Sequence, residues 1–531
     1  MGIKRFYAIA DNTITNAYDI SLRTRATGSN MGASDILEVY SVYGQESSGS
    51  VELSRVLIKF PVTGSSDSIE SARTNGDIPV SGNVNFYLKM FNARHSEQLP
   101  SDYTLNVLAV SQSWQEGYGL DMVEYADKTK DTIKGSNWMN RTSVPLNTWK
   151  KVGGDYHTAS SNSEVMYTVD FEKGDEDLEL DVTQLVEEWI LGNAGGATEI
   201  KDNYGFGVFL TSSFEGYYAN LTPAADDGVI IHNEDGQQKS FYTKRFFSRT
   251  SEFFFKRPVI EARWDSRKID NRGNFYYSSS LATGEDNLNT LYLYNYVRGQ
   301  LRNIPSVGTG QLHVSLYSGS AANNGPSGSA LDLSVGGNVA AAEDTNATGG
   351  YVSTGIYSAS FAFTGSTTLK TVYDVWHTGG EGTYIQFATG TITPKTFDSP
   401  GWNQYQQYTT KITNLKSSYT KDETARFRVF TRARDLTPTM YTVATSEIEN
   451  TVVPSASFEI KRVVDDNTVI NNSTGSSDYH TYLSYDISGS YFDLDMSLLE
   501  PGYMYGIRLY YHISDAWREQ KELFKFRVED N

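Results

Sequence analysis

Short runs in which apolar and polar residues alternate recur along the chain and predict β-strands. Asn83–Met90 and Tyr204–Leu210 are two clear cases, because alternation places the apolar side chains on one face of a strand. Turn residues separate such runs at the spacing expected of β-sandwiches. The one helical pattern before residue 270 runs from Val182 to Ile190. Asp181 is its expected N-cap and Gly192 its expected stop.

The same patterns predict an all-β fold of three tandem β-sandwich domains, with one short helix in the first. The first domain, residues 1–265, ends with the strand Arg257–Trp264, and Pro258 is expected at the start of that strand or at a sheet edge. Ser266–Asn274 is a polar linker. The second domain, 276–397, and the third, 402–531, each have the size of one sandwich. The third is expected to be immunoglobulin-like.

Strand patterns fill both later domains, with one long interruption. Ser318–Gly350 is rich in Gly, Ala, Ser and Asn, so we expect a long exposed loop there. The strands expected in these domains are Leu291–Tyr294, Gln311–Tyr317, Ile356–Phe363, Val372–Trp376, Ala425–Phe430, Ala456–Lys461, Met504–Tyr511 and Leu523–Val528.

Composition agrees with this fold and narrows the functions. Aromatic residues make up 13% of the 531 residues, which suits strands. The net charge of −19 argues against nucleic-acid binding, which needs a basic face. The absence of Cys excludes thiol catalysis, disulfides and Cys-based zinc sites. No apolar run is long enough to span a membrane, and Met1–Phe6 lacks the apolar core of a signal peptide. We therefore expect the protein to remain in the cytoplasm or to be packaged into a particle.

A basic, aromatic run departs from the acidic average. It comprises Lys244–Arg249 with Lys256 and Arg257. The favoured interpretation is a pair of edge strands whose charges block aggregation. The alternative is a surface for an acidic partner.

No motif supplies catalytic chemistry, so the sequence predicts no catalytic residues, no metal ligands and no cofactor. The chain lacks a nucleophile elbow and a phosphate-binding loop. The acidic turns Gly174–Asp177 and Asp226–Gly228 leave two alternatives, a solvated turn and a Ca²⁺ site. The aromatic runs Phe275–Tyr277 and Gly401–Tyr408 leave three, namely core or edge packing, a protein interface and glycan binding. The seven histidines are scattered without ligand spacing: His95, His157, His232, His313, His377, His480 and His512.

A set of motif residues is spread over the first half of the chain, about residues 6–265. They are Ala10-Asp11, Gly32, Arg55–Phe60, Trp114 with Gly117, Asp181–Thr183 leading to Trp189, and Asn203–Phe206. With this set the first half resembles the DNRLRE-type domain, a β-sandwich related to some carbohydrate-binding modules. That resemblance implies a jelly-roll-like first domain. One departure is a long insertion, Gly119–Ser163.

Two stretches of the second half, Tyr351–Phe361 and Phe492–Tyr503, carry a further likeness. Through them the whole chain resembles virion structural proteins of marine tailed phages, especially those that infect cyanobacteria. It implies a non-enzymatic virion protein that decorates or bridges capsid, neck or tail. The partners it implies are other virion proteins and further copies of this chain, without nucleic acid or membrane. The alternative is a carbohydrate-binding adhesin that recognises a host surface polysaccharide. A polysaccharide depolymerase is disfavoured, because such chains show a long solenoid repeat and none is visible here.

Overall fold

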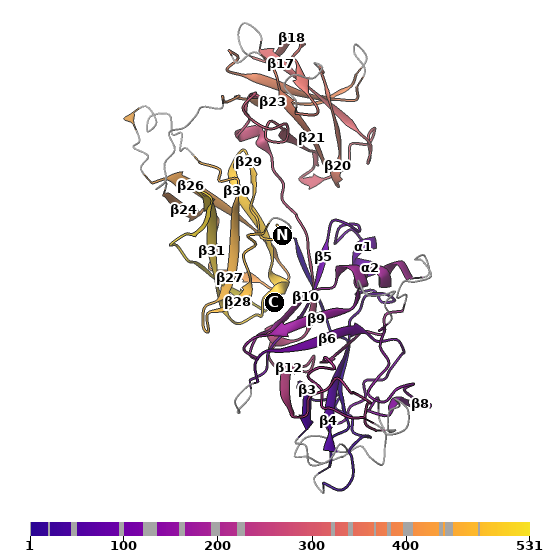
Figure 1. Cartoon of the computed structure of the whole chain (residues 1–531). Helices are drawn as coiled ribbons and strands as arrows, with labels where there is room; N and C mark the ends of the chain where they lie inside the picture. The colour runs from indigo at the N-terminus through magenta and orange to yellow at the C-terminus, as the bar shows by residue number, and fades with distance from the viewer. Residues whose placement is uncertain are drawn as a thin grey trace. The chain divides into compact units, whose positions relative to one another are not determined.

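The computed structural model divides the chain into two compact units, residues 2–265 and 266–531. Strands make up 46% of it and helices 6%, so the prediction of an all-β, multi-domain sandwich protein is confirmed. Figure 1 traces the chain and labels its elements. The residues that the structure describes are 2–19, 22–43, 50–94, 100–120, 135–158, 165–192, 202–219, 229–319, 324–337, 344–365, 368–379, 384–396, 407–434, 439–440, 450–475 and 478–530.

Two antiparallel sheets face each other in the first unit. One has the order β1-β13-β5-β10, and the other β12-β3-β4-β11-β6-β9 with β2 added to β4. Alternate side chains of both sheets, such as Phe86 and Leu88 of one and Val56 and Ile58 of the other, form a common core. The strands are β1 (Ile3–Tyr7), β2 (Ala10–Thr15), β3 (Ile36–Tyr43), β4 (Glu52–Lys59), β5 (Asn85–Met90), β6 (Tyr103–Ala109), β9 (Tyr167–Phe171), β10 (Leu178–Asp181), β11 (Phe206–Leu210), β12 (Ser240–Phe247) and β13 (Val259–Arg263). Pro258 directly precedes β13, at the start of the strand as expected.

Two short helices close this core beside β5 (Figure 1). The predicted helix is α2 (Thr183–Leu191), and its Trp189 packs edge-on against Phe206. The predicted N-cap was wrong by one residue. Val182 occupies that position, while the Asp181 carboxylate accepts a hydrogen bond from Thr183 N. The sequence patterns missed α1 (Ile69–Thr74), because six residues are too few for a visible helical period.

Residues 135–158 of the insertion pack on the outer face of the larger sheet. They contribute the hairpin β7 (Asn140–Ser143) and β8 (Leu146–Thr148) and the buried rings of Trp138 and Trp149. Both faces of β4 are consequently buried. A second apolar cluster therefore lies outside the sandwich core.

The second unit begins with one curled sheet of eight strands, in which β20 joins two layers. β20 pairs with β17 through Ala347–Gly349 and with β21 through Gly350–Ser353. A separate hairpin, β15 (Tyr296–Val297) and β16 (Gln300–Leu301), follows β14. The sheet comprises β14 (Asn289–Tyr294), β17 (Leu312–Gly319), β18 (Pro326–Ala330), β19 (Leu333–Ser334), β20 (Ala347–Ser353), β21 (Ile356–Phe363), β22 (Val372–His377) and β23 (Gln386–Ile392).

The prediction of a long exposed loop at Ser318–Gly350 was wrong. β18, β19 and the first residues of β20 lie within it, and Leu333 and Ala347 are fully buried. Small residues allow the strands to approach closely here, since a Cβ at Gly349 would come within 2.7 Å of Ser358 O. A composition typical of loops therefore concealed strands.

The last segment of the second unit is a sandwich of the immunoglobulin type. Its sheets have the orders β24-β26-β30-β29 and β25-β33-β31-β27-β28, with β32 also on β31. The pairing of β25 with β33 is parallel and all the others are antiparallel. This is the arrangement in which strands A, B, E and D face strands C, F and G. The strands are β24 (Tyr408–Ile412), β25 (Ser418–Thr420), β26 (Thr424–Ala433), β27 (Ala456–Arg462), β28 (Asn467–Ile470), β29 (Ser484–Asp486), β30 (Gly489–Asp495), β31 (Met504–Ile513), β32 (Ala516–Glu519) and β33 (Phe524–Glu529).

A tyrosine corner supports this comparison. Tyr505, at the start of β31, donates its hydroxyl to Glu500 O at 2.7 Å. This bond crosses the turn between β30 and β31, where immunoglobulin-type sandwiches place their tyrosine corner. Phe492–Tyr503, one of the stretches behind the phage resemblance, thus supplies the end of β30, the short helix η7 (Met496–Leu498) and Glu500, the acceptor of the corner bond.

The connector, residues 266–274, is bonded to both sheet systems of the second unit. Ile269 forms a parallel bridge to Tyr485, and Asp270 N donates to Tyr485 O at 3.0 Å. Toward the eight-stranded sheet, the Asn271 side chain accepts from Thr290 N. The Arg272 guanidinium holds the fully buried carboxylate of Asp374, with Nη2 2.7 Å from Oδ2. The predicted polar linker is therefore a docked segment that includes the short helix η6 (Asn271–Gly273).

Candidate functional site

Asp11, the acidic residue of the opening motif, is buried and lies in a charge network with the partly exposed side chains of Glu116 and Arg249. Its main-chain N donates to Glu116 Oε1 at 2.9 Å, and its Oδ2 accepts from Arg249 N at 2.7 Å. The Arg249 guanidinium in turn binds Glu116, with Nη2 2.7 Å from Oε2. Asp11 Oδ1 is buried without a hydrogen-bond partner in the described part of the chain. Burial raises the pKa of Asp11 to about 7, and the nearby Glu116 charge adds to that rise.

Neighbouring motif residues bind backbone and fix turns. Asn12 donates to Ser136 O at 2.9 Å and accepts from Met31 N, while Asn30 accepts from Gly32 N. Gly32 is required because a Cβ there would lie 2.4 Å from Glu116 O. These contacts hold the chain near β2 against the turn that follows Trp114. The motif residues are therefore placed to specify the fold.

Arg55 occupies a second buried polar cluster, beneath the insertion. Its Nη2 lies 3.1 Å from Glu215 Oε1, and its guanidinium lies 4.3 Å from the centre of the Phe209 ring. Both charged residues are less than a tenth exposed. The charges of Arg55 and Glu215 neutralise each other inside the protein.

The side chain of Lys244 binds the main chain of the acidic turn Gly174–Asp177. Its ammonium group donates to Gly174 O at 2.9 Å, Glu176 O at 2.6 Å and Asn92 Oδ1 at 2.9 Å. The side chain is almost completely buried, and Nζ lies 4.7 Å from the centre of the Phe171 ring. Burial lowers the pKa of Lys244 to about 8, although the acidic residues of the turn raise it. Two main-chain oxygens of the turn therefore bind an internal cation. The other acidic turn, Asp226–Gly228, lies outside the described residues.

Most charged side chains of the basic run bind partners within the first unit. β12 is an edge strand of its sheet, as predicted. The expectation that its charges are presented at the edge was wrong for Lys244, because the turn at 174–176 covers that side chain. Arg245 pairs with Glu38 of the adjacent strand, and Arg249 pairs with Glu116.

His377 and Ser315 are the nearest approach to a nucleophile and base among the described residues. His377 Nε2 lies 3.0 Å from Ser315 Oγ. Gly379 N donates to His377 Nδ1, so the ring proton resides on Nε2 and is donated to the serine. Burial lowers the pKa of His377, and the charge of His313 adds to the effect. A neutral ring with this tautomer does not accept the serine proton. His95 lies outside the described residues.

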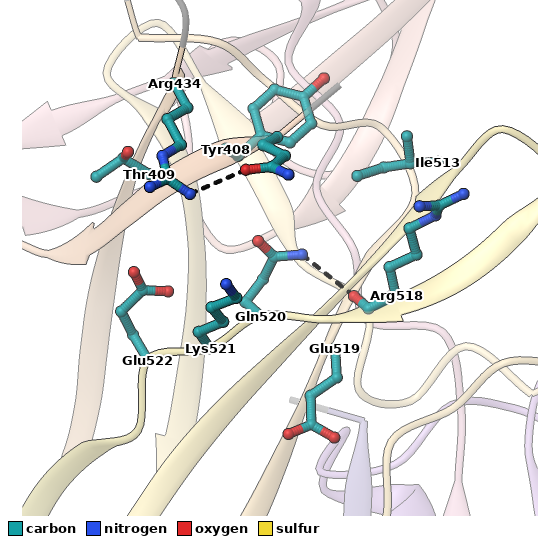
Figure 2. Close-up of a pocket in the computed structure, with 10 residues that line it drawn as sticks. Tyr408, Thr409, Arg434, Ile513, Arg518, Glu519, Gln520, Lys521 and Glu522 are labelled. Atoms are coloured by element: carbon teal, nitrogen blue, oxygen red, sulfur yellow. Dashed lines mark hydrogen bonds between the residues drawn. The ribbon is translucent and has the colours of Figure 1, made fainter. Parts of the chain in front are cut away.

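A pocket of about 510 Å³ opens in the immunoglobulin-type sandwich, between the edges of its two sheets. Tyr408 and Thr409 of edge strand β24 line one side, with Arg434 beyond β26. The other side consists of β32 and the residues after it, Gln520 to Glu522. Figure 2 shows Arg434 and Gln520 on opposite sides, with Glu522 and Arg518 flanking the space.

A two-residue bulge forms the second side of this pocket. β31 pairs with β33 up to Ile507 and with β32 from Tyr510, so only Arg508 and Leu509 lie between the two ladders. The returning strand has four residues over the same interval, Gln520–Leu523. The extra length lets Gln520 turn inward, where its Nε2 donates to Arg518 O at 3.2 Å (Figure 2). Bulges of this kind redirect side chains and occur often beside binding sites.

The two aromatic runs, Phe275–Tyr277 and Gly401–Tyr408, differ in where the structure places their described residues. Phe275 and Tyr277 are buried in the core of the eight-stranded sheet, which is the packing alternative. Residues 401–406 lie outside the described residues. Tyr408, at the end of that run, lines the pocket and packs edge-on against Tyr511. Burial raises the pKa of Tyr408, so its phenol is neutral near pH 7.

Within the described residues, no three histidine or acidic side chains gather at metal-binding distance. No helix in that part of the chain has the length and apolarity to cross a lipid bilayer.

Comparisons with known proteins do not assign the chain. No family model matches it, and no curated protein matches it. One solved structure found to be similar is a Ca²⁺-stabilized adhesin that helps an Antarctic bacterium reach out and bind ice. The two are 8% identical, the alignment covers 99% of this chain and 100% of the adhesin chain, and the TM-score is 0.13. A TM-score this low carries no argument about fold or function. The DNRLRE-type and phage resemblances therefore remain predictions.

Proposed function

We propose that the chain is a non-enzymatic virion structural protein of a tailed phage, which decorates or bridges capsid, neck or tail through its β-sandwich domains. Its proposed partners are other virion proteins and further copies of itself. Two features support this proposal: the tandem β-rich architecture and the resemblance of Tyr351–Phe361 and Phe492–Tyr503 to phage proteins.

The docked connector is the observation that carries the proposal. A free linker of nine residues would sample many conformations. Here Ile269 and Asp270 bond to Tyr485 on one side, and Arg272 holds Asp374 on the other. A connector fixed at both ends transmits position and load between its neighbours, which a structural component requires.

The proposed mechanism is geometric. Sandwich domains present edges and surface patches to neighbouring subunits, and each contact is weak. Many copies on a symmetric particle turn such contacts into stable attachment, because the later contacts form at a high effective concentration.

Immunogold labelling tests the proposal. Antibodies against this chain are applied to purified particles of tailed phages whose genomes encode it, and the particles are imaged by negative stain. We expect gold at one fixed location on every particle. Quantitative mass spectrometry of the same particles should give a fixed copy number relative to the major capsid protein. Particles that lack both the label and the peptides would contradict the proposal.

The polar pocket of Figure 2 favours a second candidate, an adhesin that binds host polysaccharide. The two functions are compatible, since a virion component can also bind a glycan. They are separated by where the protein is found and by what its pocket binds.

A further inference from the structure

We propose that the pocket between β24 and the bulge after β32 binds an acidic saccharide, one that carries a carboxylate on the sugar. This inference goes beyond a structural role. Its first support is the bulge, because an uninterrupted strand would pair with β31 along its whole length. The sandwich fold does not need the two extra residues in Gln520–Leu523, and they create the inner wall of the pocket.

The lining has the hydrogen-bonding groups that sugars require. Amides come from Gln407 and Gln520, guanidinium groups from Arg434 and Arg518, and a ring from Tyr408. Planar polar side chains of this kind can bond two neighbouring hydroxyl groups at once. The volume of about 510 Å³ lies within the range of small-ligand sites.

Several of these groups are held in place before any ligand arrives. Arg434 Nη1 donates to Gln407 Oε1 at 2.9 Å, and Arg434 N donates to Gln407 O at 2.8 Å. Gln520 is nine-tenths buried and is fixed by its own main-chain bond to Leu509 O. Tyr511, which packs against Tyr408, is locked by hydroxyl contacts with Thr410 and Thr431. Ordering these side chains on binding therefore costs little entropy.

The charges favour an anionic ligand. Arg434, Arg518 and Lys521 face the pocket with Glu519 and Glu522, so cations outnumber carboxylates in a chain whose net charge is −19. Oε1 of Glu519 lies 3.2 Å from Nη1 of Arg508, an arginine that does not line the pocket. Arg518 and Lys521 form no ion pair with another described residue. A sugar carboxylate would give the Arg518 guanidinium its bidentate partner.

The lining favours a saccharide over an added peptide strand. Strand addition to the edge of β24 that no described strand pairs with would need apolar recesses for alternate side chains. Ile513 is the one aliphatic residue among the lining residues that the structure describes.

Binding of the full-length chain to two matched probes tests the inference. The first probe is an oligosaccharide of glucuronic acid, and the second is the same oligosaccharide with its carboxyl groups reduced to alcohols. Isothermal titration calorimetry should show binding of the acidic probe that is at least about tenfold tighter than binding of the reduced probe. Raising the salt concentration should weaken binding, since the ion pair is exposed.

Substitutions inside and outside the pocket test whether the saccharide binds there. Arg518→Gln should weaken binding of the acidic probe about tenfold or more, whereas Arg527→Gln, an exposed arginine on β33 of the same sheet, should leave it unchanged. Deleting Lys521 and Glu522 removes the two extra residues and should abolish binding. Near-ultraviolet circular dichroism checks that each variant is folded.

Three results would overturn the inference. They are equal binding of the acidic and reduced probes, unchanged affinity in Arg518→Gln, and no binding of either probe. If neither probe binds, direct binding of a peptide with the sequence of Thr424–Ala433, the strand that pairs with β24, would instead assign the edge to strand addition. Each of these failures leaves the particle-labelling test of the structural role unaffected.

Discussion

Asp11 couples the stability of the first unit to pH. Burial raises the pKa of its carboxyl group from 3.8 to about 7, so between these values the folded protein binds a proton that the unfolded chain releases. The free energy of unfolding therefore falls as pH rises from about 4 to 7. Asp11→Asn keeps the acceptor for Arg249 N and remains neutral. At pH 8 we expect the variant to be more stable than the native chain by roughly 1–3 kcal/mol, and the difference should shrink as pH falls and vanish below about pH 4.

Urea unfolding at several pH values, followed by tryptophan fluorescence, measures this difference. Asp35→Asn, at an exposed position near β3, is the control and should follow the native pH profile. Parallel profiles for the native chain and Asp11→Asn would show that Asp11 does not titrate as proposed.

Lys244 offers a second test at the residue scale. Lys244→Met keeps the length of the side chain and removes the ammonium group, which leaves Gly174 O and Glu176 O buried without their donor. We expect a loss of roughly 2–4 kcal/mol in the local opening free energy. Native-state hydrogen exchange across β12 and the turn at residues 173–177 measures it. Lys239→Met, at an exposed position, should change the value by less than about 0.5 kcal/mol. Equal effects of the two substitutions would contradict the assigned role.

Single residues show where sequence reasoning stops. The sequence singles out Asp11, Gly32 and Arg55 as motif positions, and each is held by contacts within the first unit. The partners could not be predicted, because Glu116, Arg249 and Glu215 lie far away in the sequence. A lysine within a basic run is normally exposed, so nothing local marked Lys244 as buried.

At the scale of elements, alternation predicted strands well and composition predicted loops poorly. β14, β17, β21 and β22 all follow expected apolar patterns. β20 was missed because its inward residues are Ala347 and Gly349, which carry little hydrophobic signal. The pocket was equally hidden, since a bulge depends on the register between β31 and its neighbours.

The tyrosine corner gives a prediction for one element. Tyr505→Phe removes the hydroxyl bonded to Glu500 O and keeps the ring in the core. We expect the turn between β30 and β31 to lose about 1–2 kcal/mol of protection in hydrogen exchange. Tyr503→Phe is a matched control two residues away, at a partly exposed ring that Arg462 covers. Unchanged protection in Tyr505→Phe would mean that the corner bond does not stabilise the turn.

At the scale of the whole molecule, the all-β fold was predictable because alternating strand patterns extend through the chain. The docking of the connector could not be predicted from the sequence. Ser266–Asn274 has the polar composition of a free linker, and its docking depends on Asp374, Thr290 and Tyr485, each distant in the sequence.

Arg272→Ala tests whether the docked connector restrains the second unit. The substitution leaves the buried carboxylate of Asp374 with Trp376 Nε1 as its remaining side-chain donor among the described residues, at a cost of roughly 3–5 kcal/mol if the carboxylate stays charged. The connector should then detach from the eight-stranded sheet. The chain contains no native cysteine, so spin labels are introduced cleanly by Leu281→Cys and Val464→Cys, at positions 97% and 73% exposed. Electron–electron double resonance should give a narrow distance distribution in the labelled native background and a broad one with Arg272→Ala. Arg302→Ala, at an exposed arginine directly after β16, should leave the distribution narrow. A broad distribution in the native background would show that the connector is not held at both ends, and the structural role would then lose the observation that carries it.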